Sequence, residues 1–153
     1  MAAFTYLWTN RCRTNMLDAE GEPLDCMAGN MFTKRGVQTG DEVYVVGIWK
    51  GNVYLICRIT VRQVWSREDW DAEHQTPRLW EGEEVAECVD GTLMRMHRTL
   101  LASTLQQLRF LDGKGREKGL AMTDGELDDA QCLRSVRRLS PRYAELLDEV
   151  LGE

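Results

Sequence analysis

The chain has 153 residues, of which 43% are hydrophobic and 29% charged, and its formal net charge is −6. These proportions are typical of a globular domain with enough apolar side chains for a core, and they exclude a disordered chain. Neither the N-terminal residues nor any later run of about 18 residues is apolar enough for a signal sequence or a membrane span, so we expect a cytoplasmic protein with no membrane partner.

The N-terminal part of the chain predicts a strand, a long loop and a hairpin. Phe4–Thr9 is rich in aromatic and β-branched residues, as strands are. Asn10–Asn30 contains Gly and Pro without a sustained period, and so long a loop in a compact domain is usually functional or mobile. Two apolar, β-branched runs, Glu42–Trp49 and Val53–Trp65, flank the turn residues Lys50-Gly51-Asn52, which predicts an antiparallel hairpin.

The middle of the chain predicts one short helix and three further strands. Ser66 is a suitable N-cap and Asp69 follows three residues later, so a helix is expected to begin here and to end near His74. The strands are expected at Glu83–Val89, Leu93–Leu101 and Leu105–Leu111, and an exposed turn at Gly113–Gly119.

The C-terminal end predicts two helices. Within Leu127–Leu139 apolar residues recur three apart, as on one face of a helix. Ser140-Pro141 combines an N-cap with proline at the first helical position, and an apolar stripe at helical spacing follows. The expected fold class is therefore α+β, with a β-rich body, short peripheral helices and two closing helices in a single domain over residues 1–153.

Cysteine and histidine are too scattered for a metal site. The cysteines are Cys12, Cys26, Cys57, Cys88 and Cys132, and the histidines are His74 and His97. An odd number of widely spaced cysteines favours reduced thiols in a cytosol, and a structural zinc site needs closer ligands. The phosphate-binding glycine loop and the nucleophile elbow are absent as well, so we expect no metal, no cofactor and no catalytic residues.

Charge is unevenly distributed along the chain. Ser66–Asp90 holds nine acidic residues and two arginines, whereas Arg95–Arg142 holds ten basic and six acidic residues. Such a dipolar protein can still present a basic face to phosphate despite its negative net charge. Arg134, Arg137 and Arg138 are the expected phosphate-binding residues, and the alternative is a solvated surface of mixed charge.

Aromatic residues end three of the expected strands. These residues are Trp8, Trp49 and Trp65; Thr9 and Asn10 follow the first of them, and Asn30 and Phe32 close the long loop. Aromatic rings beside a polar loop can form a cage that stacks on a planar base while amide groups bind its edge. The alternative is that these tryptophans belong to the core, as most do in a small β domain.

Several of these segments together resemble a known superfamily. Phe4–Asn10, the loop to Phe32, Val37–Val46 with its Gly40-Asp41 turn, and the following hairpin resemble PUA-like domains, and within them the EVE-like branch related to YTH readers. The resemblance implies a curled β-barrel or sheet with helices packed outside. It also implies a non-catalytic nucleic-acid-binding module whose pocket recognises a modified or flipped base in DNA or RNA. Trp8 and Asn10 would line this pocket, and Trp49 or Trp65 would complete it.

Two other functions stay open. The related ASCH branch includes enzymes that act on nucleosides or RNA, and Lys34 near the pocket beside a carboxylate would favour that function. The ASCH pattern G-x-K-x-x-E-x-R is, however, missing around Phe32–Gly36. The second alternative is a protein-interaction module, whose acidic segment Ser66–Asp90 docks on the basic surface of a partner such as a nuclease or toxin.

Overall fold

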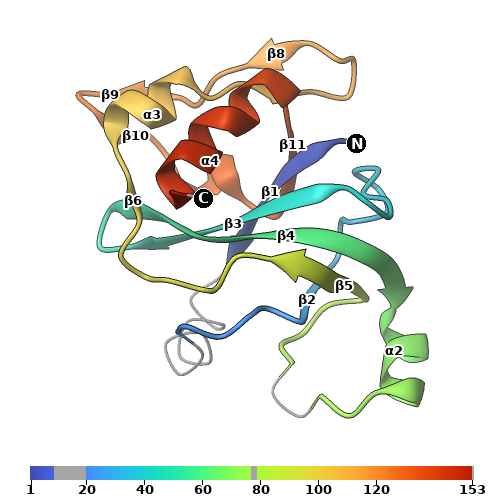
Figure 1. Ribbon diagram of the computed structural model, residues 1–153. Coiled ribbons are helices and arrows are strands. Elements are labelled where there is room, and N and C mark those ends of the chain that lie inside the picture. Colours follow the sequence, from blue (N-terminus) through green and yellow to red (C-terminus); the bar gives the residue numbers. More distant parts are fainter. Residues whose placement is uncertain (9–19, 77–78, 153) are drawn as a thin grey trace.

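The computed structural model describes residues 1–8, 20–76 and 79–152, and within them it is α+β with a core made mostly of sheet (Figure 1). The strands are β1 (Ala3–Trp8), β2 (Cys26–Gly29), β3 (Glu42–Trp49), β4 (Asn52–Ser66), β5 (Glu84–Gly91), β6 (Thr99–Leu100), β7 (Phe110–Leu111), β8 (Glu117–Lys118), β9 (Met122–Thr123), β10 (Glu126–Leu127) and β11 (Val136–Leu139). The helices are α2 (Arg67–Glu73), α3 (Ala102–Gln107) and α4 (Ala144–Leu151), with the 3-10 helices η1 (Ala130–Leu133) and η2 (Pro141–Tyr143).

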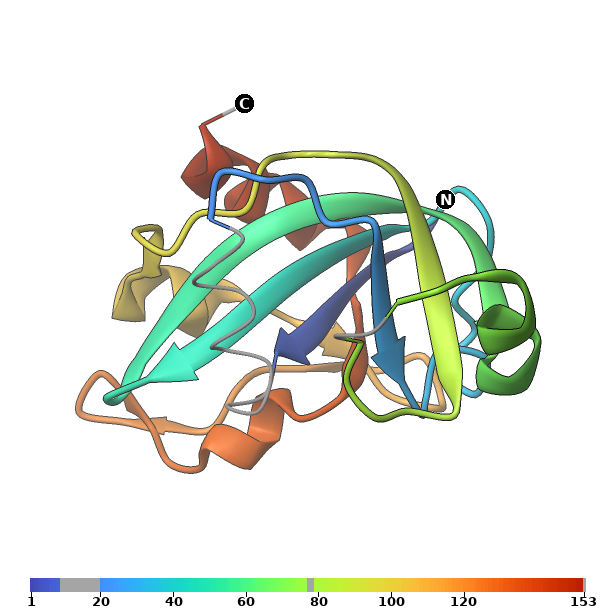
Figure 2. The ribbon, with the colours of Figure 1, turned by 90° about the horizontal axis from the view of Figure 1, so that it is seen from below.

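One mixed sheet organises the molecule, in the order β2-β5-β4-β3-β1-β11-β7-β8, with β6 beside β4. At its centre β1 runs parallel to β3 and antiparallel to β11. Figure 2 shows the strong curl of the sheet, with β4 (green) arching across the molecule. Among the described residues the two ends of the order, β2 and β8, do not pair with each other, so the sheet is curled rather than closed.

The predicted hairpin is confirmed. β3 and β4 are antiparallel neighbours, with Val43 opposite Ile59 and Ile48 opposite Val53. The two residues that connect them, Lys50 and Gly51, have φ angles of 51° and 80°. Positive φ at both positions gives the tight turn whose twist matches that of paired strands, which is why a glycine stands in it.

A second turn fixes where the central strand starts. Gly40 has a φ of 90°, and the carboxylate of the buried Asp41 accepts hydrogen bonds from the backbone N–H groups of Ala2 (2.9 Å) and Gln38 (2.8 Å). Asp41 thereby ties the chain before β1 to the chain before β3. The parallel pairing of the two strands then begins with Ala3 opposite Glu42. Because that register is set here, Trp8 is placed at the far end of the sheet, opposite Gly47.

Alternate residues of β1 face two different cores. Phe4, Tyr6 and Trp8 lie on one face, where they pack with Met27 and Phe32 among others. The opposite face is covered by α3 and α4, whose Leu105, Leu147 and Leu151 are buried against it (Figure 1). The face that carries Tyr6 and Trp8 leads to the candidate site.

The helix predicted after Ser66 is confirmed as α2. The hydroxyl of Ser66 accepts a hydrogen bond from the backbone N–H of Asp69 at 3.2 Å, and the helix ends at His74, whose N–H bonds to the carbonyl of Trp70. Trp70 is 5% exposed and packs with Cys26 and Val85. The helix is therefore fastened to the sheet by a single large side chain.

The prediction of a helix over Leu127–Leu139 is wrong. This stretch contains β10, η1 and the strand β11, which lies between β1 and β7. Val136 packs on the face that bears Tyr6, and Leu139 packs on the opposite face. Because both faces of β11 are covered, its apolar residues do not alternate and their spacing imitates a helix.

Three other sequence predictions need correction. α3 ends at Gln107 and takes the first three residues of the strand expected at Leu105–Leu111, so the strand shortens to β7. The strand expected at Leu93–Leu101 shortens to β6, and β2 lies within the expected loop Asn10–Asn30. The strand predicted at Glu83–Val89 is confirmed as β5.

Of the two expected C-terminal helices, only the second is present in the described residues. Pro141 begins η2, and α4 continues to Gly152, which has a φ of 74°. The side chain of Asp148 accepts hydrogen bonds from Tyr44 (2.7 Å) and Arg58 (2.6 Å), so α4 is held to β3 and β4. No helix in the described part of the chain is long and apolar enough to cross a membrane.

Candidate functional site: an aromatic cleft with a basic rim

A wide cleft opens where β1 ends. The ends of β1 and β2, the segment Trp80–Glu83 and the chain from η1 through β11 form its walls. Its aromatic lining consists of Tyr6, Trp8 and Trp80, and its cationic lining consists of Lys34, Arg35, Lys118, Arg134, Arg137 and Arg138. Aromatic rings and positive charges from distant parts of the sequence therefore meet in one cleft.

Two tryptophans are in contact in this cleft. The ring centroids of Trp8 and Trp80 are 4.6 Å apart, and their planes are inclined by 46°. The indole N–H of Trp80 donates to the carbonyl of Ala28 (2.8 Å) and lies 3.0 Å from the hydroxyl of Tyr6. That hydroxyl itself donates to the Ala28 carbonyl at 2.6 Å. Trp80 is thus fixed against β2 while its ring stays partly exposed.

Trp8 differs from Trp80 in both exposure and pairing. It is 5% exposed, and its indole N–H is buried without a hydrogen-bond partner in the part of the chain that the structure describes. A buried donor without a partner costs roughly 1–3 kcal/mol. Trp8 is therefore the more deeply buried of the two, and Trp80 presents the more accessible ring.

The segment that carries Trp80 lies directly on β2. A Cβ atom on Gly82 would be 2.5 Å from the backbone nitrogen of Gly29, so only glycine permits this approach. The side-chain oxygen of Asn30 accepts a hydrogen bond from the N–H of Glu83 at 2.8 Å. The glycine and the asparagine together determine the position of Trp80 relative to β2.

The six cations of the cleft differ in their partners, and Lys118 forms an ion pair with Asp112 at 3.8 Å. Arg137 is half-buried: it donates to the carbonyl of Cys132 at 2.6 Å, and its guanidinium carbon lies 4.3 Å from the ring centroid of Phe110. Burial lowers the pKa of the Arg137 guanidinium, and the positive charge of nearby Arg35 acts in the same direction. By contrast, four exposed cations make no ion pair within residues 1–8, 20–76 and 79–152, namely Lys34, Arg35, Arg134 and Arg138.

The structure brings some of the predicted site residues together and separates others. Trp8, Asn30, Arg134, Arg137 and Arg138 all line the cleft. Thr9 and Asn10 lie outside the described residues. Phe32 is fully buried beneath Tyr6, with ring centroids 5.6 Å apart, and is not part of the lining.

Trp49 and Trp65 lie away from the cleft. Trp49 is 38% exposed and flanks the turn of the β3–β4 hairpin. Trp65 packs edge-on against Trp70, with ring centroids 5.7 Å apart, and its N–H donates to Glu87 at 3.0 Å. Neither tryptophan contributes to the cleft lining, so they do not complete a cage around Trp8.

Trp80 is not among the site residues that the sequence predicts. It lies in the acidic segment Ser66–Asp90, which gives no strand or helix signal around it, and its hydrogen-bond partners Tyr6 and Ala28 are 74 and 52 residues away. The one indication near Trp80 is Gly82, two residues later in a segment without periodicity. A glycine beside a large ring indicates close packing of the backbone, but it does not identify the strand on which the segment packs.

A lysine and three carboxylates also line the cleft, namely Lys34, Glu81, Glu83 and Asp112. Lys34 lines it, but within the described residues Lys34 forms no ion pair with a carboxylate, and Glu84 instead accepts hydrogen bonds from Thr33. No group of three or more His, Cys, Asp or Glu in the described part of the chain could hold a metal ion. A comparison of the sequence with protein-family models gave no match, and a comparison with curated proteins gave none either.

Proposed function

We propose that the protein is a non-catalytic nucleic-acid-binding module that recognises a modified or flipped base of DNA or RNA in the cleft at the end of β1. The observation that carries the proposal is that the Trp8–Trp80 pair and four exposed cations line the same cleft. Bases stack on aromatic rings and phosphates contact Lys and Arg, so a nucleotide matches this combination of groups.

The spacing of the two indoles defines where a base stacks. A base sandwiched between two rings needs them about 7 Å apart, twice the contact distance of roughly 3.5 Å. The centroids of Trp8 and Trp80 are 4.6 Å apart, so the pair is closed to a third ring. We therefore assign the stacking surface to the cleft side of Trp80, with Trp8 as its support.

The exposed cations are suited to contact the phosphates of the nucleic-acid strand that carries the stacked base. Lys34 and Arg35 follow β2, whereas Arg134 and Arg138 flank and occupy β11, so positive charge lines two walls of the cleft. Arg137 is better described as a structural residue, because its guanidinium donates to the carbonyl of Cys132 and packs over the ring of Phe110. The proposal therefore moves phosphate contact from Arg137 to Arg35.

The proposal includes the PUA-like fold implied by the sequence resemblance. The central parallel pair of β1 and β3, the curl of the sheet and the Gly40-Asp41 turn before β3 support it. A pocket at the end of the first strand is the location that the resemblance implies, and the cleft lies there.

The direct test is a titration of the protein with single-stranded DNA and RNA of about ten nucleotides. Plain strands, strands with one methylated base and strands in which every nucleotide is abasic are compared. Trp80→Ala should weaken binding of base-containing strands by about ten- to a hundredfold, because base stacking contributes roughly 1–3 kcal/mol. Trp49→Ala removes an exposed ring outside the cleft and is the matched control. If no strand binds, or if both variants weaken binding equally, the function is not base recognition in this cleft.

The cations have their own readout in the same titration. Arg134→Ala combined with Arg138→Ala should lower affinity for every strand, abasic strands included, and reduce the slope of log K against log salt by about 1.4 for two lost contacts. Arg62→Ala together with Arg142→Ala removes the same charge from residues outside the cleft lining and should leave the slope unchanged. An unchanged slope in the first double variant would place the phosphate contacts elsewhere.

A further inference from the structure

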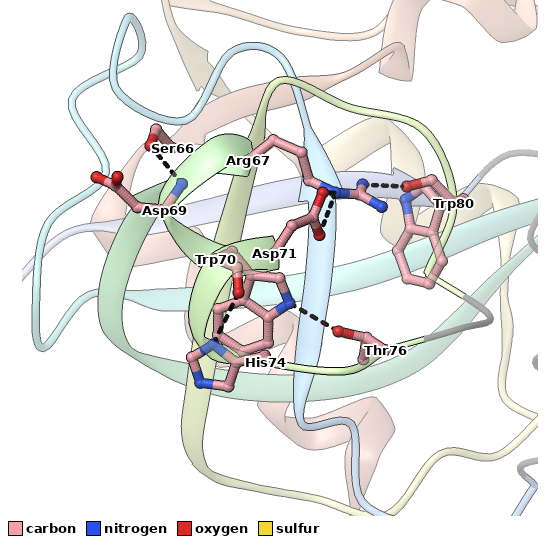
Figure 3. A network of polar contacts seen from close by, with 8 residues as sticks. All are labelled: Ser66, Arg67, Asp69, Trp70, Asp71, His74, Thr76 and Trp80. Carbon is pink, nitrogen blue, oxygen red and sulfur yellow. Dashed lines mark hydrogen bonds and ion pairs between the residues drawn. The ribbon is translucent and has the colours of Figure 1, made fainter.

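Helix α2 reaches the cleft through one side chain (Figure 3). Arg67 is the first residue of α2, and its Nη1 donates to the backbone carbonyl of Trp80 at 2.7 Å. Its Nε donates to the carboxylate of Asp71 at 3.0 and 3.1 Å, one helical turn later. The backbone N–H of Arg67 donates to the carbonyl of Glu83 at 2.7 Å. One residue thus holds both ends of the segment that carries Trp80.

We propose that Arg67, oriented by Asp71, is a positioning residue that fixes Trp80 in the cleft and thereby sets the affinity for the base. This inference rests on the proposed function. It gives a role to the acidic segment Ser66–Asp90, which is otherwise a poor match to a nucleic-acid surface. One part of the segment, Trp80–Glu83, lines the cleft, and Arg67 and Asp71 support the aromatic ring from outside the lining.

The segment Trp80–Glu83 depends on such external bonds because it belongs to no helix or strand. Its backbone is held by Arg67 at Trp80 and at Glu83, and by Asn30 at Glu83. A hydrogen bond from a charged donor contributes roughly twice as much as a neutral one. Loss of the Arg67 guanidinium therefore removes a charge-assisted hydrogen bond to the backbone carbonyl of Trp80.

The geometry requires arginine and uses Asp71 for orientation. Nε and Nη1 of a guanidinium lie in one plane, so the carboxylate on Nε directs Nη1 towards the Trp80 carbonyl, which the single ammonium of lysine cannot imitate. The side chains of Arg67 and Asp71 are 26% and 57% exposed, and an exposed ion pair contributes little stability by itself. The contribution of Asp71 is to align the arginine.

Contacts that do not involve Arg67 also hold α2 in place. Ser66 caps the helix, the indole N–H of Trp70 donates to the hydroxyl of Thr76 at 2.8 Å, and the rings of Trp70 and His74 stack with centroids 3.6 Å apart (Figure 3). These bonds do not involve Arg67. Replacing its guanidinium should leave the helix folded, so the effect on Trp80 can be measured separately.

The first test observes Trp80 without a ligand. In protein with ¹⁵N-labelled tryptophan, hydrogen exchange of each indole N–H is followed, with assignments from Trp→Phe variants. Arg67→Gln should speed exchange of the Trp80 indole by about tenfold, the effect of losing one charged hydrogen bond, and leave the Trp70 indole unchanged. Arg62→Gln, which removes an exposed charge on β4 paired at 3.6 Å with Glu87, is the control. An unchanged Trp80 indole in Arg67→Gln would overturn the inference.

The second test is a double-mutant cycle on binding. Arg67→Gln should weaken binding of base-containing strands by about tenfold, leave abasic strands unaffected, and have no further effect in the Trp80→Ala background. Asp71→Asn should act in the same direction with a smaller loss. Equal losses in both backgrounds would make Arg67 a merely structural residue. If the parent protein binds no strand, the proposed function fails, while the exchange experiment still decides whether Arg67 positions Trp80.

Discussion

Two clusters of aromatic rings, one at α2 and one in the cleft, differ in how their polar atoms are used. The α2 cluster consists of Trp65, Trp70 and His74, and the cleft cluster consists of Tyr6, Trp8 and Trp80. In the α2 cluster each of the three rings makes a hydrogen bond through a ring nitrogen. Trp65 bonds to Glu87, Trp70 bonds to Thr76, and His74 bonds to the carbonyl of Trp70. None of its members lines the cleft.

The cleft cluster is incompletely paired and open on one side. The Trp8 N–H has no partner among the described residues, the Trp80 ring is partly exposed, and exposed cations such as Arg35 and Arg138 share the cleft. A tryptophan at a strand end is therefore not by itself evidence for a binding site. An accessible ring, an unpaired donor and nearby free charge together distinguish the cleft cluster from a core cluster.

The largest expected effect separates the two clusters by stability. Trp70→Ala should lower the free energy of unfolding by about 3–5 kcal/mol, because Trp70 is 5% exposed and fastens α2 to the sheet. Trp80→Ala should cost clearly less, because the Trp80 ring already contacts solvent. Urea unfolding followed by circular dichroism measures both. A larger cost at Trp80 than at Trp70 would contradict the assignment of the two clusters.

The approach of Trp80–Glu83 to β2 gives the next prediction. Gly82→Ala should destabilise the fold by about 1–3 kcal/mol, because the new Cβ meets the backbone of Gly29 and Ala28 and the segment must move. Binding of base-containing strands should fall with it. Gly113→Ala is the control, since a Cβ there meets nothing within 4 Å. Equal stability of the two variants would show that the segment does not lie on β2.

Replacement of indole by phenyl tests the unpaired N–H. Trp70→Phe loses a hydrogen bond to Thr76, whereas Trp8→Phe removes a donor with no partner in the described part of the chain. Beyond the shared loss of ring volume, Trp70→Phe should therefore cost about 1 kcal/mol more than Trp8→Phe in thermal or urea unfolding. Equal costs would indicate that the Trp8 N–H is paired in solution.

Two buried thiols test how well each cluster excludes water. Burial raises the pKa of Cys26, which packs with Trp70, from 9.0 to about 11, and that of Cys57, which packs in the core containing Trp8, to about 12. Since the unfolded thiols ionise first, stability is unaffected below pH 9 and falls as pH rises from 9 towards these values. Urea unfolding between pH 8 and pH 10.5 should show this fall, and Cys26→Ala and Cys57→Ala should each reduce it. A fall that is the same in both variants and in the parent would come from other groups.

Elements were predictable from the sequence where residues close together in the chain determine them. The β3–β4 hairpin, the Ser66 cap of α2 and the start at Pro141 were predictable because neighbouring residues determine them. β11 was not, because its strand partners β1 and β7 and the two cores that bury its faces come from distant parts of the sequence. Trp80 was not either, since partners 52 and 74 residues away fix its place.

For the candidate site, some of the lining residues were therefore predictable, but their meeting in one cleft was not. Trp8 and Asn30 came from the sequence because they stand at the end of an expected strand and loop, and Arg138 came from the uneven distribution of charge. Their convergence with Trp80 and Arg35 depends on the parallel register of β1 and β3 and on the curl of the sheet. Long-range pairing of that kind leaves no trace in one sequence.

The central claim is that a base is bound at the cleft cluster and not at the α2 cluster, and the indole N–H resonances of the protein test it most directly. In ¹⁵N-tryptophan-labelled protein titrated with a single strand of about ten nucleotides, the signals of Trp80 and Trp8 should shift and saturate together. Those of Trp65, Trp70 and Trp49 should stay in place, and an abasic strand should leave all of them unmoved. Shifts confined to Trp65 and Trp70, or no shift at a strand concentration that saturates binding, would contradict the account.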